Sequence, residues 1–211
     1  MQIKWLGHAS FELKIDGLVF YIDPYAGEYS DKADVILISH AHYDHFNRSI
    51  AEKIMKEDTT VIGTAEVASQ IYRCRSVRPG EEGLLGETIT VKIFPAYNTS
   101  ETPQQTHTKE NGVGFLIQTP ELSIYFAGDT SFIPEMKDIK ADIALLPVGG
   151  TYTMDAKQAA EAAKLIKPKV AIPMHYGKIA GTIDDAEYFK ELLEDTEIVC
   201  KIMVPGKWET I

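Results

Sequence analysis

Residues 40–45 bring together four side chains that can bind a metal ion, namely His40, His42, Asp44 and His45. Neutral imidazole and carboxylate are the usual nitrogen and oxygen ligands of Zn²⁺. Residues 35–38, directly before them, are apolar and predict a short buried strand. A His-rich stretch can also be a solvated loop, but four ligands in six positions at the end of a strand favour a metal site.

Two further candidate ligands follow apolar segments elsewhere in the chain. Asp129 comes just after residues 122–127, and His175 comes directly after residues 170–174. Taken alone, Gly-Asp-Thr is a common turn, and a single histidine is as often a packed residue as a ligand. Because rigid strand ends hold ligands well, both become candidates once they are set beside the His cluster.

The apolar pattern predicts many strands and few helices to position these residues. Helices are expected after Ser49, which forms a possible capping box with Glu52, and over residues 155–167 and 184–193. Asp16-Gly17 predicts a tight hairpin. The segment 97–112 is polar and has no clear period, and long loops of this kind tend to be functional. Strands are expected over residues 2–6, 10–15, 18–22, 35–38, 59–62, 88–94, 113–118, 122–127, 143–146, 170–174 and 197–204.

An internal repeat relates residues 11–52 to residues 115–161. Both segments follow the plan hairpin, loop, apolar strand, loop, helix, and Lys32-Ala33-Asp34 in the first corresponds to Lys140-Ala141-Asp142 in the second. The repeat predicts an α+β fold of two related halves, a four-layer αββα sandwich. It would place residues 148–153 opposite the His cluster, where they could form a wall of the site.

Composition predicts one globular domain over residues 1–211, with 45% hydrophobic and 25% charged residues. No apolar run approaches the roughly 20 residues that span a bilayer, and the N-terminus lacks a signal-peptide pattern. The net charge of -10 argues against a nucleic-acid partner. Cys74 and Cys200 form no CxxC pair, so a thiolate site is not indicated and a reduced cytoplasmic setting is expected.

In their order, these segments resemble the metallo-β-lactamase-fold hydrolases, whose signature is His-x-His-x-Asp-His. The nearest branch is the one that resembles ascorbate-6-phosphate lactonases and uncharacterised metal-dependent hydrolases. The family fold is the αββα sandwich that the repeat suggests. The resemblance covers nearly the whole chain and is carried by residues 5–10, 40–45, 95–98, 127–130, 145–147 and 172–176.

The resemblance also implies how the candidate ligands are shared between two ions. His40 and His42 would bind the first ion, and Asp129 would bridge both. The second ion would be held by Asp44, His45 and His175. Some iron-binding relatives carry glutamate where this chain has His42, so Zn²⁺ is favoured over a di-iron redox centre, with Mn²⁺ as an alternative.

The chain departs from the family at the usual third histidine of the first site. Asn98 stands near its expected position after Phe94, and asparagine is a poor zinc ligand. We hypothesise that His107, in the polar segment 97–112, folds back and completes the first site. The alternative is a solvent-exposed loop histidine beside a weak or empty site. His8 is either a contact beside the site or a buried, hydrogen-bonded histidine.

This ligand set predicts a hydrolase that uses metal-bound hydroxide. A divalent ion lowers the pKa of bound water from about 15.7 to near 7, and a pair of ions can also polarise the substrate oxygen. Asp44 would bind metal and orient the nucleophile. We expect a small, anionic metabolite as substrate, with lactone or ester hydrolysis first and phosphodiester hydrolysis second.

Two other classes of protein fit parts of the pattern. Asn98 would suit a non-catalytic metal-binding or sensing relative with an incomplete first site. Asp44 and Asp129 argue against that class, because a structural site tends to saturate its ligands. Bound iron with a visible charge-transfer band would indicate a redox enzyme.

Overall fold

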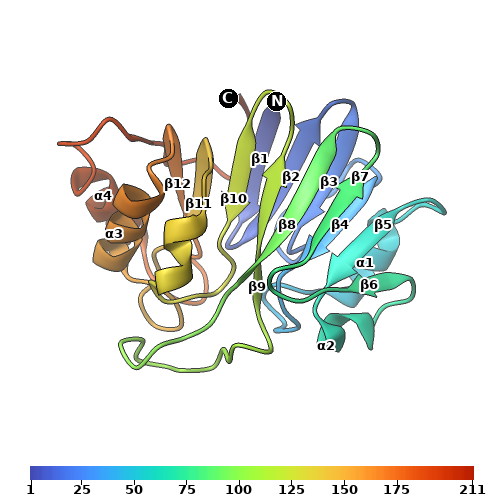
Figure 1. The fold of residues 1–211 in the computed structure, drawn as a ribbon, viewed down its shortest axis with the longest axis horizontal. Coiled ribbons are helices and arrows are strands. Elements are labelled where there is room, and N and C mark those ends of the chain that lie inside the picture. The colour runs from blue at the N-terminus through green and yellow to red at the C-terminus, as the bar shows by residue number, and fades with distance from the viewer. The chain divides into compact units, whose positions relative to one another are not determined.

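The computed structural model describes residues 1–211, which form two compact units. The first unit comprises residues 1–77 and 203–211, and the second comprises residues 78–202. Each unit has its own seven-stranded mixed sheet and only a few helices (Figure 1). The predicted α+β fold class of two related halves is therefore confirmed, since each half has a mixed sheet and a few helices. No helix of this chain combines the length and the apolar character needed to cross a bilayer.

The sheet of the first unit has the strand order β14-β1-β2-β3-β4-β5-β6. Its strands are β1 (Gln2–Gly7), β2 (Ser10–Ile15), β3 (Leu18–Ile22), β4 (Val35–Ile38), β5 (Thr60–Gly63), β6 (Cys74–Ser76) and β14 (Trp208–Thr210). The first three strands pair antiparallel, and β3 through β6 are parallel. The hairpin at Asp16-Gly17 forms as predicted, with φ angles of 51° and 81°, which a type I′ turn requires.

Two helices, α1 (Arg48–Ile54) and α2 (Ala65–Ala68), cover one face of this sheet. Ala51 and Ile54 of α1 pack with Ile36 and Ile38 of β4. The predicted cap at Ser49 is wrong. Asn47 is the N-cap, since its side chain accepts a hydrogen bond from the Ile50 N–H, and asparagine caps helices as well as serine does.

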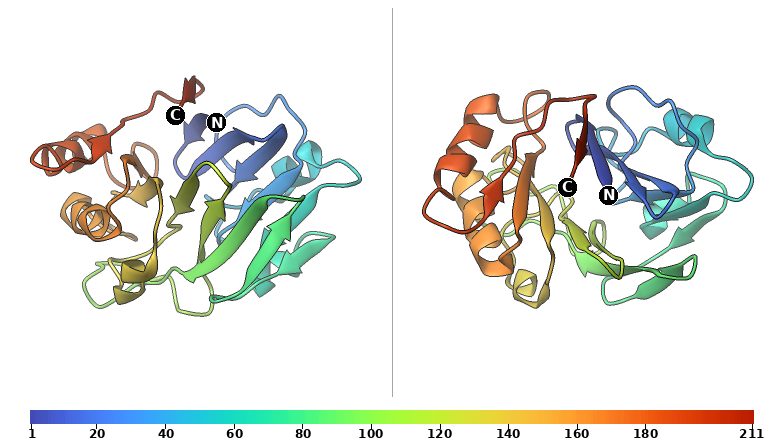
Figure 2. Two further views of the ribbon diagram at one scale, coloured as in Figure 1. Left: turned by 45° about the horizontal axis from the view of Figure 1, so that its top comes forward. Right: turned by 90° about the horizontal axis from the view of Figure 1, so that it is seen from above.

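The sheet of the second unit has the order β13-β12-β11-β10-β9-β8-β7. Helices α3 (Ala156–Ile166) and α4 (Ile183–Glu191) and the 3₁₀ helix η1 (Pro134–Asp138) accompany it. Figures 1 and 2 show α3 and α4 together on one side of β11 and β12, which they contact. The strands are β7 (Glu82–Leu85), β8 (Ile89–Pro95), β9 (Val113–Gln118), β10 (Ser123–Phe126), β11 (Ile143–Pro147), β12 (Val170–Met174) and β13 (Val199–Cys200).

The internal repeat is present in the strand registers. Tyr21 of β3 pairs in parallel with Ile36 of β4, and Tyr125 of β10 pairs in the same way with Ala144 of β11. The corresponding aspartates, Asp34 and Asp142, also make the same kind of hydrogen bond. The carboxylate of Asp34 accepts the Val19 N–H at 2.7 Å, and that of Asp142 accepts the Ser123 N–H at 2.8 Å. Each unit is therefore built on one plan, with parallel strand ends on a single sheet edge.

The C-terminal part of the chain differs from the prediction. The strand expected over residues 197–204 is reduced to β13, because only Val199 and Cys200 pair with β12. The chain then turns at Pro205-Gly206, and β14 pairs with β1 in the first unit. The short elements α2, β6, β7 and η1 were not predicted, since their exposed or very short apolar patterns carry no clear period.

Candidate metal centre

The His cluster of the first unit begins where β4 ends. His40 is the second residue after this strand, and Asp23 directly follows the parallel neighbour β3. Because the carboxyl ends of parallel strands meet at one edge of a sheet, these side chains lie together. The loop then turns at His42, whose carbonyl oxygen accepts the N–H groups of His45 and Phe46 at 3.0 and 2.9 Å.

Asp23 connects two of the predicted ligands and is fully buried. Its Oδ2 accepts hydrogen bonds at 2.6 Å from His45 Nδ1 and from the Ser39 hydroxyl. Its Oδ1 accepts the Ser39 N–H, also at 2.6 Å. Burial raises the pKa of Asp23, and the hydrogen bonds from His45 and Ser39 oppose that rise. The carboxylate holds the His45 ring with Nδ1 protonated, so that Nε2 is the atom left to bind a metal.

Ser39 extends this arrangement to His40. Its hydroxyl proton is directed to Asp23, so the serine oxygen accepts from His40 Nδ1 at 2.9 Å. His40 therefore also keeps Nε2 for a metal. Asp23 and Ser39 hold candidate ligands, and neither residue was predicted from the sequence. Asp23 satisfies the rule that singled out Asp129 and His175, because it too comes after an apolar strand.

The spacing of His40 and His42 suits a shared ion. His40 Nε2 lies 3.1 Å from His42 Nδ1. Two atoms that each lie 2.0–2.1 Å from a tetrahedral zinc are about 3.3 Å apart. His40 is buried and His42 is exposed.

His8 contacts Asp44, which settles where this histidine lies. His8 Nε2 is 3.0 Å from Asp44 Oδ2, and the Trp5 indole donates to the His8 carbonyl oxygen at 2.9 Å. The same Asp44 oxygen lies 3.9 Å from His45 Nε2. His8 is thus a buried, hydrogen-bonded histidine and also a contact of the candidate ligand Asp44, so both of the roles considered from the sequence apply to it.

The backbone is strained at three residues of the candidate site. His8, Asp23 and His175 have φ angles of 55°, 45° and 60°, in the left-handed region that non-glycine residues rarely adopt. Strain of this kind persists only where the surrounding structure imposes it, and it gathers at functional sites.

The second unit brings together Asp129, His175 and His107. Asp129 follows β10, and His175 follows β12, at the shared carboxyl edge of parallel strands. Asp129 Oδ2 lies 3.1 Å from His175 Nε2 and 3.4 Å from His107 Nε2. Both distances match the edge of about 3.3 Å in a tetrahedral zinc shell. One carboxylate oxygen therefore faces two imidazole nitrogens.

His107 is buried, although it belongs to an irregular loop. The exposed loop histidine that was the alternative is therefore not what the structure shows. Asn98 contacts its ring, with Asn98 Oδ1 at 2.9 Å from His107 Nδ1. Asn98 thus supports a histidine and does not replace one as a ligand. His107, nine positions after Asn98 in the chain, is the histidine that lies beside Asp129.

Gly149 explains how His175 fits against the loop after β11. A Cβ at Gly149 would lie 2.4 Å from the His175 carbonyl oxygen and 3.1 Å from its Nδ1. Only glycine permits this approach. The neighbouring Tyr176 is buried, and burial raises its pKa to about 12, so its hydroxyl stays protonated at neutral pH.

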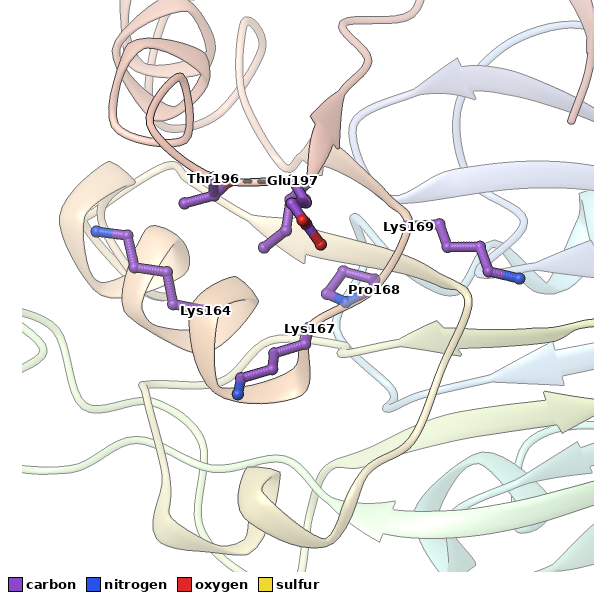
Figure 3. A pocket seen from close by; sticks show the side chains of 7 residues that line it. Lys164, Lys167, Pro168, Lys169, Thr196 and Glu197 are labelled. Carbon is purple, nitrogen blue, oxygen red and sulfur yellow. Dashed lines mark hydrogen bonds between the residues drawn. The ribbon is translucent and has the colours of Figure 1, made fainter.

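A separate groove lies where α3 ends (Figure 3). Lysines from the end of α3 and the start of β12 line it, but Lys164 pairs with Glu161 and Lys169 pairs with Asp142. Cations near a helix C-terminus also stabilise the helix dipole. None of the predicted metal ligands lines this groove.

The donor set of both units fits a divalent metal. It consists of imidazole nitrogens and carboxylate oxygens, which Zn²⁺ and Mn²⁺ accept. At least three of the histidines, His40, His45 and His107, have Nδ1 held by an oxygen, as metal-binding histidines usually do.

Comparisons with known proteins agree with this chemistry. A family model described as a β-lactamase superfamily domain matches residues 2–175. A UPF0173 metal-dependent hydrolase of Methanopyrus kandleri is 37% identical, over 98% of this chain and 98% of its own length. A second UPF0173 metal-dependent hydrolase, from Caldivirga maquilingensis, is 36% identical over 97% of this chain and 95% of its own length.

A solved structure is similar as well. Igni18, described as a metallo hydrolase from Ignicoccus hospitalis, has a TM-score of 0.83 and 26% identity over 99% of this chain and 97% of its own. The resemblance to the metallo-β-lactamase-fold hydrolases is thereby confirmed, while the lactonase-like branch stays a prediction. The chain belongs to the β-lactamase superfamily, within the UPF0173 metal-dependent hydrolases.

Proposed function

We propose that this metal-dependent hydrolase holds two zinc ions and hydrolyses a small, anionic lactone or ester. The observation that carries the proposal is the position of Asp129 Oδ2, which lies within 3.4 Å of both His107 Nε2 and His175 Nε2. A carboxylate that faces two imidazoles suits a ligand shared between two ions. Mn²⁺ is the alternative metal.

The proposal follows the division of ligands that the family resemblance implies, with His107 completing the first site. His40, His42 and His107 would hold the first ion. Asp129 would bridge to the second ion, whose remaining ligands would be Asp44, His45 and His175. The proposal treats residues 1–211 as one hydrolase domain.

Bound divalent ions would supply a hydroxide nucleophile at neutral pH and would polarise the substrate oxygen. The chain's own part is to orient these groups. Asp44 would align the nucleophile, and His8 would hold Asp44 through the contact at 3.0 Å. Tyr176, protonated at neutral pH, would donate a hydrogen bond to the oxyanion that develops on the substrate.

Lactone or ester hydrolysis leads because the sequence is similar to the branch that resembles ascorbate-6-phosphate lactonases. Phosphodiester hydrolysis is the closest rival, since the same metal chemistry serves attack on phosphorus. A cytoplasmic setting belongs to the proposal, because Cys74 and Cys200 are both free thiols, as expected in a reducing compartment.

The test combines metal analysis with turnover. Zinc, manganese and iron are measured per chain, and the same preparation is assayed against a lactone panel, p-nitrophenyl esters and bis-p-nitrophenyl phosphate. We expect two zinc ions and turnover of at least one lactone or ester. Tight metal binding with no turnover of any substrate would favour the non-catalytic reading. Iron with a charge-transfer band would indicate a redox enzyme.

A further inference from the structure

Asn98 is the best-connected residue of the irregular segment 97–112. Its Oδ1 receives the backbone N–H groups of Thr106 and His107, each at 2.9 Å. Its Nδ2 donates to the Tyr152 carbonyl oxygen at 2.7 Å. Its backbone N–H also donates to the His107 carbonyl oxygen at 2.9 Å. Every polar group of the side chain therefore has a defined role.

These contacts determine which way the amide of Asn98 points. Two backbone N–H groups can only donate, so the atom that they approach must be the oxygen. The Tyr152 carbonyl can only accept, so the atom beside it must be the NH₂ group. The amide is thus oriented by backbone groups that have a single hydrogen-bonding role.

The orientation of Asn98 in turn determines the tautomer of His107. His107 Nδ1 lies 2.9 Å from Asn98 Oδ1, which is an acceptor only. Nδ1 must therefore carry the proton. The same N–H can also donate a hydrogen bond to the Thr106 hydroxyl oxygen, which lies 3.2 Å away. A neutral imidazole with Nδ1 protonated keeps its lone pair on Nε2, the atom that lies 3.4 Å from Asp129 Oδ2.

We propose that Asn98 is a positioning residue that holds His107 as a ligand of the first metal ion. The side-chain oxygen of Asn98 sets both the direction and the tautomer of the His107 ring, as carbonyl or carboxylate partners do for metal-bound histidines. Asn98 stands near the position where the family resemblance leads us to expect a histidine, and it would support a histidine instead of providing one. This inference rests on the proposed function, because it assumes that His107 binds metal.

Two substitutions separate this role from simple anchoring of the loop. Asn98→Asp keeps an oxygen for His107 and the two backbone N–H groups but loses the donor to Tyr152. Asn98→Leu has a similar volume and removes both. Asn111→Leu is the matched control, since Asn111 lies in the same segment with its side chain exposed. His107→Ala reports the loss of the ligand itself.

Each full-length variant is stripped of metal and titrated with Zn²⁺ against a chromophoric chelator. A second titration follows the visible absorption of Co²⁺, and circular dichroism checks the fold. We expect Asn98→Leu to bind the first ion about 10- to 100-fold more weakly than wild type does. Its Co²⁺ absorption band should also be weaker than that of wild type, as in His107→Ala. Asn98→Asp and Asn111→Leu should stay close to wild type. In ¹⁵N NMR spectra of zinc-loaded wild type, His107 should carry its proton on Nδ1.

The inference is overturned if Asn98→Leu binds both ions with wild-type affinity while His107→Ala loses one. It is also overturned if Asn98→Asp is as weak as Asn98→Leu, because the contact to Tyr152 would then be what matters. A wild-type chain that binds no metal, or a His107→Ala variant that keeps both ions, would instead contradict the ligand assignment. Failure of the ligand assignment can be told apart from failure of the inference, because wild type and His107→Ala both keep Asn98.

Discussion

Asp23 Oδ2 lies 2.6 Å from His45 Nδ1, and the same oxygen accepts the Ser39 hydroxyl at 2.6 Å. Through Ser39 the carboxylate also reaches His40. In the proposed assignment His40 belongs to the first ion and His45 to the second. A single buried carboxylate would therefore orient ligands of both ions, and this makes Asp23 the most informative residue outside the ligand set.

The substitution Asp23→Asn should weaken the binding of both ions. Three donors converge on the two oxygens of Asp23. Asparagine replaces one of those oxygens with an NH₂ group, which can only donate. We expect a loss of about 10- to 100-fold in zinc affinity, measured by competition with a chelator. Asp142→Asn is the control, since Asp142 also binds a backbone N–H at a strand end but contacts no predicted ligand. Equal affinity in Asp23→Asn and wild type would contradict this role.

The substitution Gly149→Ala should displace His175. The added methyl group would meet the His175 carbonyl oxygen at 2.4 Å, so either the loop or the histidine must move. We expect the binding of the second ion to weaken, as seen by zinc titration. Gly86→Ala is the control, because Gly86 has a φ of 63° but open space around it. It should lose stability from backbone strain, roughly 1–2 kcal/mol, and keep its metal affinity. Similar metal loss in both variants would contradict a specific role for the close approach of Gly149 to His175.

Replacement of His8 should slow turnover more than it reduces metal content. His8 touches Asp44, which would align the nucleophile, and it is not one of the proposed ligands. His8→Asn is the preferred variant, because asparagine tolerates the φ of 55° better than most residues do. We expect kcat to fall about 10- to 100-fold, with two ions still bound per chain. An unchanged kcat in His8→Asn would contradict a functional role for His8.

The pair Asp142–Lys169 should stabilise the fold at neutral pH and not in acid. The hydrogen bond from Lys169 lowers the pKa of Asp142 below its ordinary value of 3.8. Because the folded-state pKa is the lower one, this stabilisation is present above pH 3.8 and is lost as the pH falls through the folded-state value. Asp142→Asn should therefore be less stable than wild type at pH 7, by less than about 1 kcal/mol for such an exposed lysine.

Urea unfolding of wild type and Asp142→Asn at pH 7 and pH 3 measures this difference. The gap in unfolding free energy should narrow in acid. A gap that stays the same at both pH values would mean that the pair contributes no charge-dependent stability.

The fold was predictable wherever a strand has its own apolar pattern. The hairpin at Asp16-Gly17 and the buried strands β4 and β12 follow from local sequence. The last strand does not, because β14 is held by contacts distant in sequence. The ring of Trp208 lies 4.4 Å from Lys4 Nζ and 4.7 Å from Lys14 Nζ, and no periodic pattern near residue 208 reveals this.

The site was predictable for residues with ligand chemistry of their own. The positions of Asp129 and His175 follow from strand ends that share one sheet edge. Asp23 also follows an apolar strand, as Asp129 does, but it was not predicted, and its contacts with Ser39 and His45 appear only in the fold. His107 could be suggested only as a substitute, since its position depends on hydrogen bonds from Asn98 across an irregular loop.

The most direct test of the account is a zinc titration of the metal-free chain with turnover followed at each step. A lactone or ester found in the substrate panel serves as the reporter. The account predicts no turnover without metal, and activity that rises to a maximum as two ions bind per chain. His45→Ala and His175→Ala, one from each unit, should each bind fewer ions and lose activity. Full turnover by a chain verified to be free of metal would contradict the central claim.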